Sequence, residues 1–262
     1  MSAVGYTSDE MMTVTAARML KNGAICFVGI GLPSTAANLA RLSHAPDAVL
    51  IYESGPIGAK PPVLPLSIGD GNLAETADTV VSTPEIFRYW LQGGRVDVGF
   101  LGAAQLDKFA NINTTVIGDY KKPKVRLPGA GGAPEISTSA KEVLIIVKQT
   151  KRSFVEKMDF ITSPGFLTGG DARVKAGITS KGPVAVITDL CVMKPDPDTK
   201  ELTVSSIHPG ITREQIEKET GWAIKFIDNC GETGTPTAKE LETLRDLKAR
   251  TAAAHGTAET AA

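Results

Sequence analysis

The chain has 262 residues, and its 28 Lys and Arg residues nearly balance its 29 Asp and Glu residues, which leaves a formal net charge of -1. Nucleic acids and anionic membranes bind surfaces with an excess of basic residues, so this balance argues against either as the main partner. The length allows a substantial core, in one large α/β domain or in two small ones.

The first half of the chain alternates helical signals with short apolar runs. Thr7 and Glu10 match a capping box, so a helix is expected from Thr7 to about Asn22. Gly23 is a typical helix stop. In chain order, the further elements predicted are strands in 24–29, 48–52 and 96–102 and helices that begin near Pro33 and Ser82.

The second half continues the alternation. Apolar runs predict buried strands at 142–149 and 183–193, and residues 194–210 predict a hairpin with its turn between Asp196 and Lys200. Two late helices are expected in 212–221 and 237–250, because each begins with a Thr cap and has Gln or Glu three residues on. Residues 253–262 are small and polar, which predicts a disordered tail.

Short apolar strands separated by helices are typical of an α/β fold with an open, mostly parallel sheet covered by helices. The chain has no internal repeat and no long Pro/Ser-rich linker, which predicts one α/β domain over residues 1–252. Two segments, 61–79 and 108–134, are rich in Gly, Pro and Asn. Loops of that length inside a compact domain are usually functional.

Cysteine usage and the N-terminus predict a cytoplasmic protein. Cys26, Cys191 and Cys230 are far apart and odd in number, so neither a disulfide framework nor a metal site is expected. The N-terminal residues lack the basic and apolar regions of a signal peptide, and no apolar run is long enough to span a bilayer. The sequence also lacks a G-x-S-x-G elbow and a Walker motif.

Two candidate sites lie at the ends of early strands. "GIGLP" at 29–33 is a strand-to-helix turn where glycines let backbone N–H groups approach a ligand, although a tight turn alone would explain Gly29 and Gly31 equally well. Glu53 follows a buried strand and precedes Ser54 and Gly55. Either it is a solvated carboxylate, or it is a nucleophile or general base in a partly dry cleft.

Two more candidates lie in the middle of the chain. "GAGGA" at 129–133 leaves several backbone N–H groups unshielded, as an oxyanion hole requires, although a flexible loop would have the same composition. Gln105 follows a buried strand and could bind a substrate carbonyl. Asn111, Asn113 and Asp119 could simply form turns.

Taken in order, the segments "VGIGLP", "YESGPIGA", "GAAQLDKFANINTTVIGDY", "LPGAGGA" and "TSPGF" resemble the β subunit of family I CoA-transferases, with the glutaconate CoA-transferase type as the nearest likeness. The resemblance extends from about Tyr6 to about Arg250. It implies a CoA-transferase fold of the NagB/RpiA-like kind. It also implies a separate α subunit, with assembly to α2β2 or higher.

The resemblance assigns roles to the candidates. It implies that Glu53, in the E-x-G motif, is the catalytic nucleophile and that Gly131, Gly132 and Ala133 form the oxyanion hole. An asparagine that helps some relatives to hold the thioester carbonyl is replaced here by Leu101, which makes Gln105 a candidate substitute. The residues expected to contact CoA or substrate are Gly29, Gly31, Ser54, Gly55, Gln105 and Gly129.

The implied reaction is ping-pong transfer of CoA between carboxylic acids through a glutamyl-CoA thioester on Glu53. The acids would be a dicarboxylate such as glutaconate, or a 3-oxo acid. CoA is then a substrate, and no metal or other cofactor is expected. A CoA-ester hydrolase or decarboxylase on the same fold is the alternative, and a non-catalytic binding subunit is a third hypothesis.

Overall fold

The computed structural model describes residues 5–256. Within them the chain forms two compact units, one from residues up to Arg88 together with those from Pro236, and the other from Tyr89 to Thr235. We call these the first unit and the second unit. The prediction that residues 1–252 act as one domain stays a prediction.

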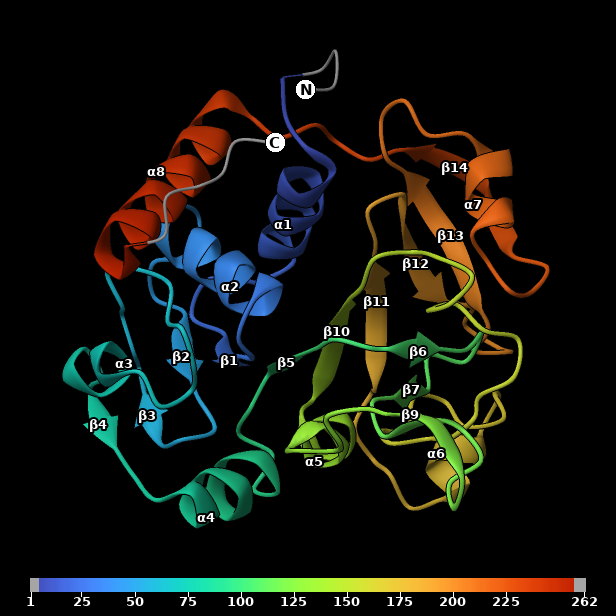
Figure 1. Ribbon diagram of the computed structural model, residues 1–262, viewed down its shortest axis with the longest axis horizontal. Helices are drawn as coiled ribbons and strands as arrows, with labels where there is room; N and C mark the ends of the chain where they lie inside the picture. Colours follow the sequence, from blue (N-terminus) through green and yellow to red (C-terminus); the bar gives the residue numbers. More distant parts are fainter. Residues whose placement is uncertain (1–4, 257–262) are drawn as a thin grey trace. The chain divides into compact units, whose positions relative to one another are not determined.

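The first unit combines short strands with helices, shown in blue, teal and red in Figure 1. Strand β1 pairs in parallel with β2, and β2, β3 and β4 continue as antiparallel neighbours. Helices α1, α2 and α8 pack against one another. In chain order its elements are α1 Ser8–Arg18, β1 Ile25–Phe27, α2 Leu32–Leu42, β2 Val49–Ile51, β3 Pro56–Ile57, α3 Gly71–Glu75, β4 Thr79–Val80, α4 Thr83–Glu85, a π-helical segment Ile86–Leu91 that runs into the second unit, and α8 Ala238–His255.

Helix α1 begins as the sequence predicts and ends earlier. Thr7 caps it: the Thr7 N–H donates to the Glu10 carboxylate at 2.8 Å, and the Glu10 N–H donates to the Thr7 hydroxyl at 3.2 Å. The prediction that it extends to about Asn22 is wrong, because the N–H of Leu20 bonds the carbonyl of Ala17, three residues back. Such a bond tightens the last turn and closes the helix.

Two ion pairs attach helix α8 to α1. The Arg18 guanidinium donates to both carboxylate oxygens of Glu240, at 2.7 and 2.6 Å, and Arg245 does the same to Glu10, at 2.7 and 3.0 Å. Paired bonds of this kind are the strong form of an Arg–carboxylate contact. Helix α8 continues to His255, so its last turn lies in the segment predicted as a disordered tail; residues 257–262 lie outside the described residues.

The second unit contains a sheet with the strand order β14-β13-β12-β11-β10-β5. The strands β5, β10 and β11 run parallel, and β13 and β14 also pair in parallel. With β1 and β2, these strands confirm the predicted open, mostly parallel α/β sheet. In chain order the elements are β5 Val98–Leu101, β6 Gln105–Leu106, β7 Ile112–Asn113, β8 Val116–Gly118, β9 Pro123–Arg126, α5 Ala133–Ser139, β10 Glu142–Ile146, α6 Ala172–Lys175, β11 Pro183–Ile187, β12 Cys191–Pro195, β13 Leu202–Ile207, α7 Arg213–Lys218 and β14 Lys225–Glu232.

The single strand predicted at 183–193 is two antiparallel strands, β11 and β12. A tight turn separates them, because the Thr188 hydroxyl oxygen accepts from the N–H groups of Leu190 and Cys191 at 3.0 and 2.9 Å. The apolar residues on both sides of the turn hide it from a reading based on hydrophobicity. Strand β14 was not predicted, because its exposed residues lack an apolar pattern.

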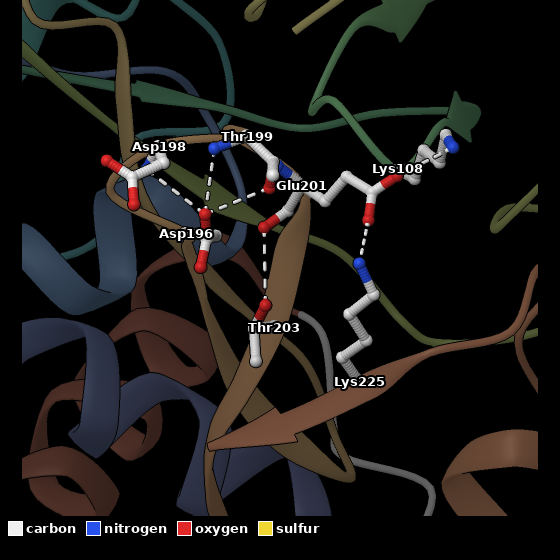
Figure 2. Close-up of polar contacts among 7 residues, drawn as sticks. All are labelled: Lys108, Asp196, Asp198, Thr199, Glu201, Thr203 and Lys225. Atoms are coloured by element: carbon white, nitrogen blue, oxygen red, sulfur yellow. Dashed lines mark hydrogen bonds and ion pairs between the residues drawn. The ribbon is translucent and has the colours of Figure 1, made fainter. Parts of the chain in front are cut away.

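The hairpin predicted at 194–210 is confirmed as β12 and β13. One carboxylate oxygen of Asp196 accepts from the N–H groups of Asp198 and Thr199, which shapes the turn. Figure 2 shows the Glu201 carboxylate between Lys108 and Lys225, at 2.7 and 2.6 Å. This acid therefore ties the hairpin to strand β14 and to the loop after β6, as a structural contact.

The two segments predicted as long loops contain short elements. Residues 61–79 hold helix α3, and residues 108–134 hold strands β7, β8 and β9. Strand pairs of two to four residues leave little periodicity in the sequence. Among the described residues, no helix is both long and apolar enough to cross a membrane.

Candidate active site

Glu53 lies at the tip of the turn between β2 and β3. The N–H of Gly55 donates to the carbonyl of Tyr52 at 3.0 Å, and the N–H of Tyr52 donates to the carbonyl of Pro56 at 3.1 Å. Glu53 and Ser54 therefore occupy the two central positions of a tight turn. The Glu53 side chain is partly buried, and within residues 5–256 no hydrogen bond or ion pair engages its carboxylate.

Gly55 closes this turn in a way that only glycine allows. Its φ is +121°, and a Cβ atom at this position would lie 2.0 Å from the carbonyl oxygen of Val81. The N–H of Val81 also donates to the carbonyl of Gly55 at 3.1 Å. The segment after β4 is thus packed directly against the turn that carries Glu53.

Tyr52 anchors the other side of the turn to helix α2. Its side chain is fully buried, and its hydroxyl lies 3.3 Å from both the Ser34 hydroxyl and the Asn38 amide nitrogen. Burial raises the pKa of Tyr52 above its ordinary value, so the hydroxyl stays neutral and bonded. The residue that precedes Glu53 is therefore held by a buried polar contact.

Gly29 and Gly31 lie at the same sheet edge as Glu53. Strands β1 and β2 are parallel, with Phe27 opposite Ile51, so the residues that follow each strand emerge side by side. Gly31 has a φ of +83° and precedes the first residue of α2. The first unit thus brings Gly29, Gly31, Glu53 and their neighbours to the carboxyl end of a parallel strand pair, where ligands of open α/β sheets bind.

Ser54 is engaged within the protein. Its hydroxyl donates to the carbonyl of Ile68, which belongs to the segment 61–79. That segment is therefore fastened to the turn that carries Glu53. The predicted contact of Ser54 with CoA or substrate stays a prediction, and a ligand would have to share or replace this hydrogen bond.

The glycine-rich loop lies in the second unit and is clamped at Gly129. The N–H of Gly129 donates to the carbonyl of Thr114 at 2.8 Å, and the Thr114 hydroxyl donates to the carbonyl of Gly129 at 2.7 Å. The N–H groups of Gly131 and Gly132 have no hydrogen-bond partner in the described part of the chain. The N–H of Ala133 donates to the carbonyl of Ala130 at 3.1 Å, so it is already used in a turn.

Gln105 supports this clamp from the interior. Its side-chain oxygen accepts from Asn113 at 2.6 Å, and its amide nitrogen donates to Asp159 at 2.9 Å. The Asn113 oxygen accepts in turn from the N–H of Thr115 at 2.9 Å. Gln105 is only 6% exposed, and its side chain is bonded within this network next to Thr114. Its predicted contact with substrate stays a prediction.

Sequence reasoning missed Arg173, which holds helix α5 behind the glycine-rich loop. Its buried guanidinium donates to the carbonyls of Ser137 and Gly165, at 2.5 and 2.8 Å, and to the Ser180 hydroxyl at 2.7 Å. Burial lowers the pKa of Arg173 to about 10, and it remains charged at neutral pH. Its partners are backbone carbonyls distant in sequence, which leave no motif to detect.

The other polar candidates are structural. Asn111 accepts from the N–H groups of Gly165 and Leu167, at 2.9 and 3.0 Å, and Asp119 accepts from the N–H groups of Lys121 and Lys122. Among the residues that the structure describes, no group of three His, Cys, Asp or Glu side chains could hold a metal ion.

Comparison with known proteins identifies close relatives. The family model described as coenzyme A transferase matches residues 9–219. The chain is 72% identical over 251 residues to one subunit of the 3-oxoadipate CoA-transferase of Pseudomonas knackmussii, covering 96% of each chain. It is 34% identical to the corresponding subunit of the glutaconate CoA-transferase of Acidaminococcus fermentans, covering 92% of each. The crystal structure of glutaconate coenzyme A-transferase from that organism matches with a TM-score of 0.87 and 32% identity, covering 93% of this chain and 95% of the other.

Proposed function

The chain belongs to the coenzyme A transferase family as a β-type subunit, and we propose that its enzyme transfers CoA between an acyl-CoA donor and 3-oxoadipate. The observation that carries this proposal is the 72% identity, over nearly the whole chain, to a subunit of a 3-oxoadipate CoA-transferase. The acid is both a dicarboxylate and a 3-oxo acid, so it unites the two substrate classes expected from the sequence. Glutaconate becomes the second choice, with 34% identity behind it.

We assign the nucleophile to Glu53. A carboxylate is a weak nucleophile in water and a stronger one when it is partly desolvated and held near its target. The position of Glu53 at a rigid turn, partly buried and without an internal cation, supports this role. The neighbouring Gly55 lets the Val81 carbonyl pack against the turn, which fixes the backbone that carries Glu53.

The proposed reaction has two half-reactions. The Glu53 carboxylate attacks the thioester carbonyl, which releases the CoA thiolate and forms an acyl-glutamyl anhydride. The thiolate then attacks the glutamyl carbonyl, which releases the donor acid as a carboxylate and leaves a glutamyl-CoA thioester. The acceptor carboxylate repeats these steps in reverse order, so the products are its CoA ester and free Glu53.

Each tetrahedral intermediate carries an oxyanion, for which we propose the N–H groups of Gly131 and Gly132 as donors. Both groups are without a partner in the described part of the chain, and the hydrogen bonds from Thr114 and Arg173 hold their surroundings in place. Loss of one such donor typically raises a barrier by about 2.7–4 kcal/mol. Gly29, Gly31 and Gly129 are proposed to line the path of CoA.

We further propose that the active enzyme contains an α subunit, in an α2β2 or larger assembly, and that CoA is a substrate with no metal or redox cofactor. Both relatives are named as one subunit of their enzymes, which supports the need for a partner. A CoA-ester hydrolase or decarboxylase is the less favoured alternative, because the high identity is to a transferase subunit.

The test uses the purified complex of this chain with its α subunit. The complex is incubated with a panel of acyl-CoA donors, and the glutamyl thioester is trapped by borohydride reduction before peptide mass mapping. A reduced residue at Glu53 is expected, together with loss of transfer to 3-oxoadipate in Glu53→Ala. Glu75→Gln, at an exposed acid of α3, is the matched control and should stay active. Full transfer by Glu53→Ala, or the absence of a modified Glu53 peptide, would overturn the assignment.

A further inference from the structure

The β8–β9 hairpin concentrates positive charge on an otherwise balanced chain. Lys121, Lys122, Lys124 and Arg126 fall within six residues, whereas the whole chain has 28 basic residues in 262 and a net charge of -1. All four side chains are exposed. Residues 121–126 contain no acid, and the nearest acid in the sequence is Asp119. We call Lys121, Lys122, Lys124 and Arg126 the basic hairpin.

The lysines of the basic hairpin are not neutralised by ion pairs. Within residues 5–256, no ion pair joins Lys121, Lys122 or Lys124 to an acid. One Asp119 oxygen accepts from the backbone N–H groups of Lys121 and Lys122, at 2.8 and 2.9 Å, which shapes the turn. This differs from Lys108, whose charge is met by Glu201 (Figure 2).

Arg126 of the basic hairpin is held by contacts with Tyr120. The Tyr120 ring stacks on the Phe160 ring with centroids 5.5 Å apart. The Arg126 guanidinium lies 5.1 Å from the centre of the Tyr120 ring. Arg126 also donates to the carbonyl of Tyr120 at 3.2 Å. A guanidinium fixed in this way is suited to phosphate, because little freedom is lost on binding.

The basic hairpin leads directly into the glycine-rich loop. Strand β9 ends at Arg126, and Gly129, three residues later, is clamped by Thr114. Gly131 follows Arg126 by five positions, so their Cα atoms lie within about 18 Å. In CoA the phosphates and the thiol lie at opposite ends of the long pantetheine arm, so one ligand could engage the hairpin with its phosphates and the loop with its thioester.

We propose that the basic hairpin binds the 3′-phosphate and diphosphate groups of CoA. The inference rests on the proposed transferase function and adds the place where the nucleotide end of the substrate is held. Several exposed cations would attract one anionic ligand, and salt screens such attraction, so CoA binding should weaken as ionic strength rises.

The test compares acyl-CoA with the matching acyl-pantetheine, which has the same thioester and no phosphate. The variant Lys121→Ala/Lys122→Ala/Lys124→Ala is assayed in complex with the α subunit. We expect the KM of this variant for acyl-CoA to rise about tenfold, and the salt dependence of that KM to be mostly lost. The kcat and the KM for acyl-pantetheine should be unchanged. The control Lys151→Ala/Lys194→Ala/Lys218→Ala removes the same charge from exposed lysines of the second unit and should leave both KM values unchanged.

Three outcomes would overturn the proposal. They are an unchanged KM for acyl-CoA, an equal rise for both thioesters, and loss of assembly with the α subunit, which would make the hairpin a protein interface. Calorimetric titration of CoA into the wild-type and triple-variant complexes separates this proposal from the function. A wild-type complex that binds CoA more tightly than the variant, yet transfers it to no acid, would refute the function and keep the binding site.

Discussion

Replacement of Gly55 by alanine should both destabilise the protein and displace its proposed nucleophile. The Cβ atom of Gly55→Ala would lie 2.0 Å from the Val81 carbonyl oxygen and 3.2 Å from its carbonyl carbon. These are backbone atoms, so no side-chain rotation relieves the overlap. Either the segment after β4 moves away or the turn that carries Glu53 changes shape.

The magnitude follows from two contributions. A residue with a side chain at a φ of +121° costs on the order of 1–3 kcal/mol in backbone strain. Separation of the two segments also removes the hydrogen bond from the Val81 N–H to the Gly55 carbonyl, a loss of about 1 kcal/mol. Together they predict a decrease of roughly 2–4 kcal/mol in the free energy of unfolding.

Gly23→Ala is the matched control. Gly23 has a φ of +76°, and nothing lies within 4 Å of the position of its added Cβ. Its substitution therefore adds left-handed backbone strain without a collision, which costs about 1–2 kcal/mol. The difference between the two variants isolates the contact with Val81.

Urea denaturation followed by circular dichroism measures the stabilities, and CoA transfer by the complex with the α subunit measures function. We expect Gly55→Ala to lower kcat by about 100-fold, the effect of a misplacement of roughly 1 Å, while Gly23→Ala keeps normal activity. If both variants lose the same stability and Gly55→Ala stays active, then Val81 does not fix the turn and this contact does not position Glu53.

Two further predictions concern the supporting contacts. Thr114→Val removes the hydroxyl that clamps Gly129, so it should lower kcat about tenfold and the free energy of unfolding by about 1 kcal/mol, with KM nearly unchanged. Thr114→Ser should restore activity, and a normal kcat in Thr114→Val would contradict the clamp. Burial opposes ionisation of Glu240, but hydrogen bonds from Arg18 and Thr237 outweigh it and lower the pKa of Glu240 from 4.5 to about 2. Ionised Glu240 therefore contributes at most about 3 kcal/mol to the free energy of unfolding above pH 4.5, and this contribution is lost as the pH falls toward 2. Urea midpoints measured across that range should fall less steeply in Glu240→Gln, and equal slopes would disprove the linkage.

Local signals in the sequence predicted the helix starts and the place of the candidate nucleophile. The capping boxes at Thr7, Thr212 and Thr237 are confirmed, since in each the hydroxyl accepts from the backbone three residues on. Glu53 was expected at the end of a buried strand and follows β2 by two residues. These features depend on neighbours within a few positions, which is the range that a sequence pattern reports. The proposed role of Glu53 as nucleophile came from the family resemblance.

Contacts between distant segments could not be predicted. The Gln105 side chain meets Asp159, 54 positions away, and nothing in the local sequence distinguishes this buried amide from one that faces a substrate. The same holds for Arg173, whose partners are main-chain carbonyls that any residue could supply. Strand β14 escaped because edge strands with exposed residues lack the apolar pattern that marks a core strand.

The return of the chain to its first unit has a consequence for biosynthesis. Helix α8 packs with α1 and α2, and Arg18 meets Glu240 across 222 positions of sequence. On the ribosome, α1 and α2 emerge long before their last partner is made, whereas all of the second unit is synthesised before α8. The second unit can therefore reach its native contacts first. Until α8 is made, the α1–α2 pair is only partly covered, and its exposed apolar surface favours aggregation at this stage.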